Sequence, residues 1–79
     1  MKEFTSLDEI LLDETAIIED VRCVGNIKRR LLDLGFIKGT KITPVLVSPS
    51  KDPRAFFIRG MTIAIREEEA RQVLVSRIR

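Results

Sequence analysis

The chain has 79 residues, 14 lysines plus arginines against 12 aspartates plus glutamates, and no histidine, tryptophan or tyrosine. The absence of histidine excludes Ser-His-Asp and Cys-His nucleophile pairs, His-ligated zinc enzymes and His-ligated haems. The single cysteine can form neither an internal disulfide nor a Cys-x-x-Cys site. A chain this short has room for one thin core. We therefore expect a single domain over residues 1–79 and no enzymatic activity.

The N-terminal region predicts neither export nor membrane insertion. Residues 1–15 are rich in carboxylates, which is the reverse of a cationic signal followed by an apolar core. The longest uncharged run, residues 42–50, is far shorter than the roughly 20 residues that span a bilayer. We expect a cytoplasmic protein.

Short runs rich in valine, isoleucine and threonine predict β-strands. Five such runs occur, at residues 15–21, 41–47, 54–59, 62–66 and 73–75. Pro44 has no amide donor, so the second run is expected at a sheet edge or a bulge. Gly60 and Met61 connect two alternating runs and predict a type II′ hairpin. The pattern indicates a mainly β protein, a small barrel of about five strands.

One short helix is predicted over residues 27–34, between the first and second strands, with Asn26 as its N-cap. Its apolar stripe consists of Ile27, Leu31 and Leu34. Gly35 and Phe36 are expected to end it in a Schellman arrangement.

Two further local signals follow the helix. Lys38 and Gly39 suit the central pair of a type II turn, because glycine accepts a positive φ. Residues 67–69 are three glutamates, which favour the first turn of a helix, so a helical turn is predicted before the last strand.

The densest basic cluster lies on the predicted helix, at Lys28, Arg29 and Arg30. Such a cluster can contact phosphate or an acidic partner, but it is also the ordinary solvated face of an amphipathic helix. No aromatic residue is interleaved for stacking on single-stranded nucleic acid, and the net charge is only +2. The residues alone favour the solvated face and count against nucleic-acid binding.

No metal or cofactor site is expected. Cys23 is one sulfur without histidine, so it is predicted as a small, partly buried apolar residue at the end of the first strand. Adjacent helical glutamates do not converge on one ion. Phe56 and Phe57 alternate across a strand, so one is predicted in the core and the other is available to a partner.

Three segments together resemble the ferrous iron transport protein A family, FeoA. They are RRLLDLGFIKGTKI at residues 29–42, the loop that ends in Asp52-Pro53, and IAIREEEARQVLV at residues 63–75. The positions that match the family's pattern are Arg30, Leu31, Leu34, Gly35, Gly39, Asp52, Pro53, Arg66, Glu69, Ala70 and Val75. The chain departs from the family at Asp13-Glu14, where a glycine is common, although aspartate tolerates turn conformations.

The resemblance implies an SH3-like β-barrel that works in the cytoplasm with FeoB, the membrane-embedded ferrous iron transporter. It implies an accessory or regulatory role without a cofactor. We predict that the chain docks on FeoB through Lys28, Arg29, Ser48, Ser50, Lys51, Asp52 and Phe56. The alternative is a metal-responsive domain that binds Fe²⁺ or a similar ion through carboxylates and Cys23 and regulates a partner. Exposed edges of a partly open barrel also allow a homo-oligomer by strand pairing.

Overall fold

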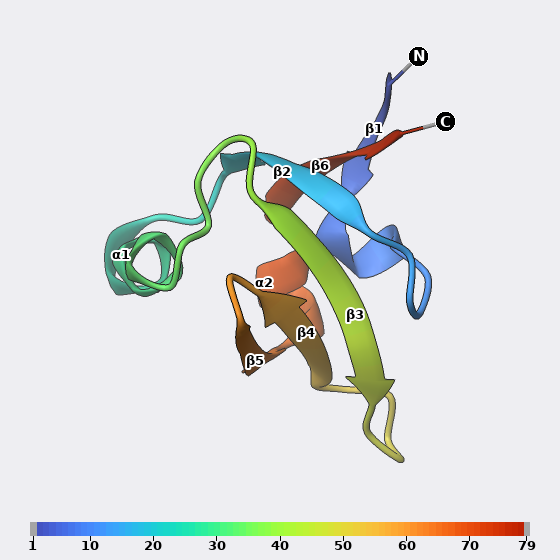
Figure 1. Cartoon of the computed structure of the whole chain (residues 1–79). Helices are drawn as coiled ribbons and strands as arrows, with labels where there is room; N and C mark the ends of the chain where they lie inside the picture. The colour runs from blue at the N-terminus through green and yellow to red at the C-terminus, as the bar shows by residue number, and fades with distance from the viewer. Residues whose placement is uncertain (1, 79) are drawn as a thin grey trace.

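The computed structural model describes residues 2–78. It contains one antiparallel sheet with the strand order β1-β6-β2-β3-β4-β5, which curls around a single core (Figure 1). The strands are β1 (Lys2–Ser6), β2 (Ala16–Val21), β3 (Lys41–Val47), β4 (Arg54–Ile58), β5 (Met61–Ile65) and β6 (Val73–Ile78). The helices are the 3-10 helix η1 (Leu7–Glu9), α1 (Gly25–Asp33) and α2 (Glu67–Ala70). The predicted mainly β fold is confirmed.

The sheet has six strands where the sequence predicted about five. The additional strand, β1, pairs along β6 from Lys2↔Ile78 to Ser6↔Leu74. Its first residues are exposed and charged, so they lack the alternating apolar pattern by which a strand is recognised. Strand β6 is also longer than predicted, because it pairs with β1 on one side and β2 on the other. The sheet is not closed, and β1 and β5 are its two ends.

The core lies inside the curled sheet and is mostly aliphatic, with two phenylalanines as its largest side chains. Its buried members are Leu7, Ile10, Ala16, Ile18, Val21, Cys23, Leu31, Phe36, Ile42, Phe56, Ile58, Ile65, Ala70, Val73 and Val75. Two bulges bend the sheet, one between Ile18 and Asp20 in β2 and one between Pro44 and Leu46 in β3. The second bulge confirms the expectation for Pro44.

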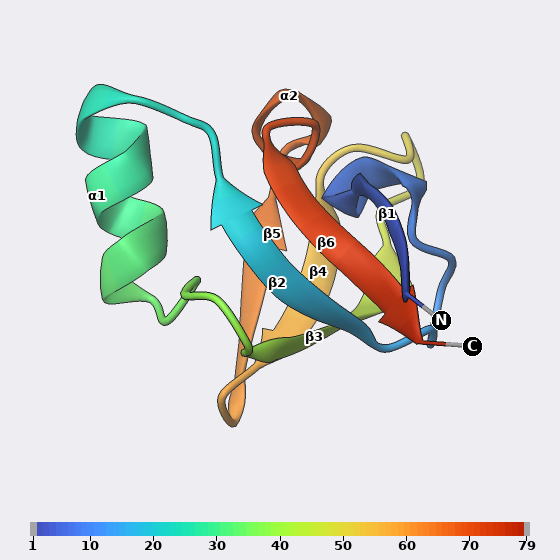
Figure 2. The ribbon, with the colours of Figure 1, turned by 90° about the horizontal axis from the view of Figure 1, so that it is seen from above.

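Helix α1 stands beside the barrel and does not cover it (Figure 2). Leu31 is its one buried residue, whereas Ile27 in the predicted apolar stripe is 42% exposed. The prediction of Asn26 as the N-cap is wrong, because the chain turns at Gly25, with φ +65°, and the helix begins there after Val24. The predicted Schellman end is confirmed, since Phe36 N–H donates to the Leu31 carbonyl at 3.0 Å.

The turns agree with the sequence at two places and differ at one. Gly39, with φ +94°, occupies the predicted turn after α1. Asp13 adopts φ +65°, so the turn at which the chain departs from the family pattern is kept with aspartate. The β4–β5 hairpin turns on Arg59 and Gly60, whose φ angles are both positive. That is the type I′ form, so the predicted type II′ turn at Gly60-Met61 is wrong, and Met61 belongs to β5.

Candidate functional site

A cleft of about 360 Å³ opens beside the loop that joins β3 to β4. Its walls come from η1, this loop, β4 and α2, and its lining residues are Asp8, Glu9, Val47, Lys51, Asp52, Arg54, Phe56, Ile65, Glu67 and Ala70. Three of the predicted docking residues, Lys51, Asp52 and Phe56, therefore lie around one cavity. The cleft combines apolar side chains with carboxylates, which is a composition suited to binding.

Arg54 fastens η1 to strand β4 at one wall of the cleft. Its Nη1 donates to the Ile10 carbonyl at 2.7 Å, and its Nη2 donates to the carbonyls of Leu7 and Asp8, both at 3.1 Å. The Leu7 carbonyl also accepts the Ile10 N–H at 3.2 Å. The carbonyls at the end of a short helix lack partners within the helix, and a charged fork of donors satisfies several carbonyls at once. The guanidinium carbon also lies 5.1 Å from the centre of the Phe56 ring. Arg54 thus positions the wall that carries Asp8 and Glu9.

The opposite wall is the loop at residues 48–53, whose shape is set by its own hydrogen bonds. Lys51 has φ +71° and its N–H donates to the Ser48 carbonyl at 2.8 Å. The Ser50 hydroxyl donates to the Asp52 carbonyl at 2.9 Å, and Asp52-Pro53 is a cis peptide. The predicted residues Ser48 and Ser50 therefore shape this loop, and neither is among the residues that line the cleft.

Asp52 connects the loop to helix α2. Its Oδ1 accepts the Glu67 N–H at 2.9 Å, so a side chain from the loop satisfies a free amide at the start of α2. Within α2 the Glu69 carboxylate accepts the Arg66 N–H at 3.2 Å. The hydrogen bond between Asp52 and Glu67 therefore fixes the position of the loop relative to α2 at the cleft.

Carboxylates outnumber cations around the cleft. Four carboxylates line it, at Asp8, Glu9, Asp52 and Glu67, against the cations of Lys51 and Arg54. Glu67 lies 2.5 Å from the Arg71 guanidinium, and this hydrogen bond raises the pKa of Arg71. Asp8 accepts the Ser6 hydroxyl. Within residues 2–78 neither Asp8 nor Glu9 forms an ion pair, although the negative charge of Asp8 also contributes to the raised pKa of Arg71.

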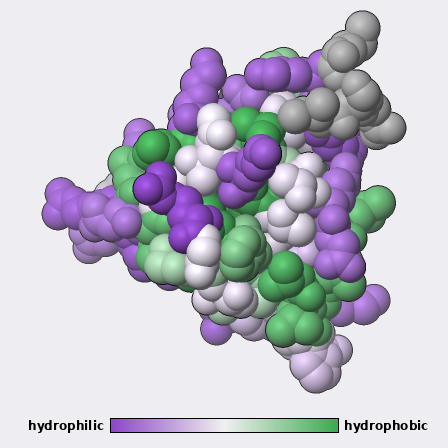
Figure 3. Space-filling model, viewed as in Figure 1, coloured by the Kyte–Doolittle hydropathy of each residue, from purple (hydrophilic) through white to green (hydrophobic). Residues whose placement is uncertain are grey.

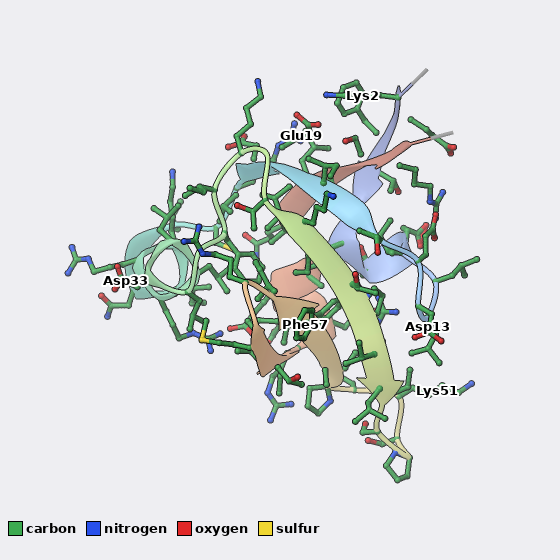
Figure 4. All side chains as sticks on the ribbon, viewed as in Figure 1. Lys2, Asp13, Glu19, Asp33, Lys51 and Phe57 are labelled. Atoms are coloured by element: carbon green, nitrogen blue, oxygen red, sulfur yellow. The ribbon has the colours of Figure 1, made fainter. Side chains whose placement is uncertain are left out.

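The predicted helix residues lie apart from the cleft. Lys28 and Arg29 are exposed on α1 and border a separate shallow hollow with Gly25, Leu32 and Asp33. Figure 4 shows Asp33 of α1 and Lys51 of the loop on opposite sides of the molecule, and Figure 3 shows hydrophilic side chains over α1. The neighbouring Arg30 contacts Glu69 at 2.8 Å and thereby connects α1 to α2. The structure divides the predicted surface into a helix part and a loop part.

The predicted exposed phenylalanine is corrected. Phe56 is 0% exposed and belongs to the core beneath the cleft, whereas Phe57 is 46% exposed on the outer face of the sheet. Neighbouring residues of a strand point to opposite faces of the sheet, so Phe56 and Phe57 must differ. Which of the two is buried depends on the direction in which the sheet curls. Phe56 can therefore act only as part of the cleft floor.

Cys23 is 2% exposed, as a small core residue, and burial raises the pKa of its thiol. Across the part of the chain that the structure describes, no three Cys, Asp or Glu side chains are placed to hold a metal ion. The helices of residues 2–78 include none long and apolar enough to cross a membrane.

The strongly curled antiparallel sheet and its single core define a small SH3-like β-barrel protein. The FeoA domain family matches residues 5–77, and the chain belongs to this family of ferrous iron transport proteins. The predicted family resemblance is confirmed.

Three relatives illustrate the similarity. The Fe(2+) transport protein A/Fe(2+) transporter FeoB fusion protein of Porphyromonas gingivalis is 32% identical over 72 residues, which is 91% of this chain and 8% of the fusion protein. The FeoA protein of Chlorobium tepidum has a TM-score of 0.88 at 28% identity, covering 95% of this chain and 71% of that one. FeoA of Stenotrophomonas maltophilia, crystallised with zinc and described as a prokaryotic SH3 domain protein, has a TM-score of 0.81 at 32% identity, covering 90% and 88%.

Proposed function

We propose that this protein is a small cytoplasmic accessory or regulator of ferrous iron uptake that acts by binding the FeoB transporter. The observation that carries the proposal is the Porphyromonas gingivalis relative, in which a region similar to this chain and FeoB are named as one fusion protein. Fusion keeps two modules at a high effective concentration, which is useful when they act on each other. The proposed role has no catalytic step.

The two predicted surfaces offer different chemistry for this docking. Lys28 and Arg29 form no ion pair within residues 2–78 and are exposed on a helix that lies beside the barrel. The 48–53 loop carries Lys51 and Asp52 at the rim of the cleft. A partner that binds one conformation of FeoB more tightly than another biases the transporter's equilibrium by that difference in affinity. Binding through these surfaces is therefore sufficient for regulation.

The test of the helix surface is a charge reversal, Arg29→Glu. We expect the affinity for the cytosolic portion of FeoB to fall about tenfold, because a surface charge that attracts the partner then repels it. The melting temperature is expected to stay near that of the wild type, since Arg29 is exposed on the helix. Calorimetric titration measures the affinity.

The matched control is Lys41→Glu, the same change of charge at an exposed residue of β3. Its affinity should match that of the wild type. Unchanged affinity in Arg29→Glu would exclude the helix surface, and a pull-down with the separate cytosolic and membrane portions of FeoB would then locate the contact.

A second candidate function is a metal-responsive domain that regulates a partner. It is favoured by one observation, the zinc in the crystal structure of Stenotrophomonas maltophilia FeoA. In this chain Cys23 is buried, and the described residues do not gather three ligands at one point. A site of this kind would have to be assembled between two copies, so we favour the role in docking.

A further inference from the structure

We propose that the cleft beside the 48–53 loop binds a lysine or arginine side chain from an extended segment of a protein partner. The inference deepens the proposed function, because it names the chemistry that the partner must present. The inference depends on the proposed function only where it takes FeoB to be the partner. The cation would lie near Asp8 and Glu9, with its aliphatic stem on the cleft floor.

The floor of the cleft fits an aliphatic stem. Phe56, Ile65 and Ala70 form its buried apolar base, and Val47, which is 42% exposed, supplies accessible apolar surface. Long basic side chains commonly cover apolar surface with their methylene groups while the charged end stays near water. A volume of about 360 Å³ accommodates one or two side chains, at the small end of the usual range for binding cavities.

The rim of the cleft fits a positive charge. Asp8 and Glu9 make no ion pair among residues 2–78, and the Asp52 carboxylate lies at the same opening. The fourth carboxylate, Glu67, is already paired with Arg71. Of the two cations in the lining, Arg54 uses its guanidinium on three backbone carbonyls. The other, Lys51, is exposed on the loop. With Glu67 neutralised by Arg71, the attraction for an incoming cation comes from Asp8, Glu9 and Asp52.

The arrangement fits a side chain better than a bare metal ion. A divalent ion requires several oxygen ligands at about 2–2.6 Å from one point. The carboxylates of the cleft come from η1, the loop and α2, and no three acidic or cysteine side chains of the described chain gather for such a site. An ammonium or guanidinium group on a long stem is attracted by carboxylates distributed around a rim.

The experiment uses two capped heptapeptides, Ac-GLKLRLG-NH2 and its acidic twin Ac-GLELELG-NH2. Each is titrated at low salt into the isotope-labelled protein while amide shifts are followed by NMR. We expect the basic peptide to shift the amides of residues 8–9, 51–54 and 65–70, and the acidic peptide to leave them unchanged. Equal shifts from both peptides, or shifts from the basic peptide elsewhere only, would overturn the proposal.

Variants sharpen the result. Asp8→Asn with Glu9→Gln keeps the shapes of the side chains and removes two charges, so binding of the basic peptide should weaken about fivefold at low salt. Glu68→Gln with Asp20→Asn removes two exposed carboxylates outside the cleft and should have no effect. Lys51→Ala removes a repelling charge and should strengthen binding of the basic peptide. Loss of folding would weaken binding, so a stronger affinity cannot result from misfolding.

A FeoB titration separates this inference from the proposed function. If the cytosolic portion of FeoB binds the Asp8→Asn, Glu9→Gln variant as tightly as the wild type, the cleft inference is overturned and the proposed function stands. If FeoB binds neither protein while the basic peptide still enters the cleft, the proposed function fails and the chemistry of the cleft stands.

Discussion

At the scale of single residues, Gly35 is fixed by two separate constraints. Its φ of +101° belongs to the left-handed region, where side chains with a Cβ are strained. A Cβ added to it would also lie 2.2 Å from Cδ of Arg59. Gly35 therefore lets α1 end and lets the β4–β5 hairpin pack against that end.

Substituting Gly35 and Gly39 separates the two constraints. Gly39 has φ +94° and open space around its missing Cβ, so Gly39→Ala measures strain alone, about 1–2 kcal/mol of unfolding free energy. Gly35→Ala should lose more, because Arg59 must also move. Adding Arg59→Ala to Gly35→Ala should recover the excess. Urea denaturation gives these free energies, and equal losses at both glycines would show that Arg59 moves aside without cost.

The roles of residues that depend on their sequence neighbours were predictable from the sequence. The roles that depend on contacts with residues far along the chain were not. Gly35 and Gly39 follow from a helix end and a turn within a few positions. Arg54 gives no comparable signal, because the carbonyls that it contacts are 44 to 47 positions away. The alternation of Phe56 and Phe57 was readable, but the curl of the sheet decided that Phe56 is the buried one.

At the scale of elements, three strands meet at one carboxylate. Glu19 lies at the bulge of β2, where the pairing with β6 shifts between Ile18 and Asp20. Its Oε2 accepts the buried Ser76 hydroxyl of β6 at 2.7 Å, and Lys2 of β1 lies 3.5 Å away (Figure 4). A bulge redirects a side chain, and here it directs Glu19 toward both neighbours.

This contact predicts a dependence of stability on pH. The Ser76 hydroxyl, followed in importance by Lys2, lowers the pKa of Glu19 in the folded state. The contact therefore stabilises the fold fully above the pKa that Glu19 has in the unfolded chain, and this contribution is lost as the pH falls through the lower pKa of the folded state. In Ser76→Ala we expect the Glu19 pKa to rise and the acid-side loss of stability to shrink. NMR titration of the carboxyl carbon measures the pKa, with the exposed Ser50→Ala as control, and an unchanged pKa would contradict the assignment.

The elements also show where sequence patterns stop being informative. Strands β2 to β5 and the first half of β6 were anticipated from short apolar and β-branched runs. Strand β1 begins with exposed residues and forms a strand by pairing with β6. The existence of α1 was predicted, yet its packing was not, since an apolar stripe does not tell how far a helix stands from the barrel.

At the scale of the whole molecule, the same limit applies to the candidate site. Lys51, Asp52 and Phe56 line one cleft, whereas Ser48 and Ser50 of the same loop do not. Lys28 and Arg29 were predicted to contact the same partner as the loop, but α1 and the 48–53 loop lie on opposite sides of the molecule (Figure 4). The η1 carboxylates, Asp8 and Glu9, also line the cleft, but they are more than 35 positions from its other residues, so no sequence pattern indicates their place.

The whole molecule also sets an expectation for metal ions. The chain has no histidine, and its one thiol is buried. We therefore expect anaerobic titration with Fe²⁺ to show no stoichiometric binding at micromolar concentration. Sedimentation velocity with and without the ion should show one unchanged species. Tight binding accompanied by dimer formation would support the metal-responsive alternative over the docking role.

The pairing of β1 with β6 has a consequence for how the chain can be tethered. Lys2 and Ile78 lie opposite each other at one end of these strands, while η1 and α2, which form the cleft, adjoin the other end (Figure 1). A partner joined through a linker after β6 would therefore be attached on the side away from the cleft. To enter it, the linker must run back along the strand, roughly 20 Å for six residues. A shorter linker would leave the cleft free for a different molecule, so tether length alone can decide between binding within one chain and binding between chains.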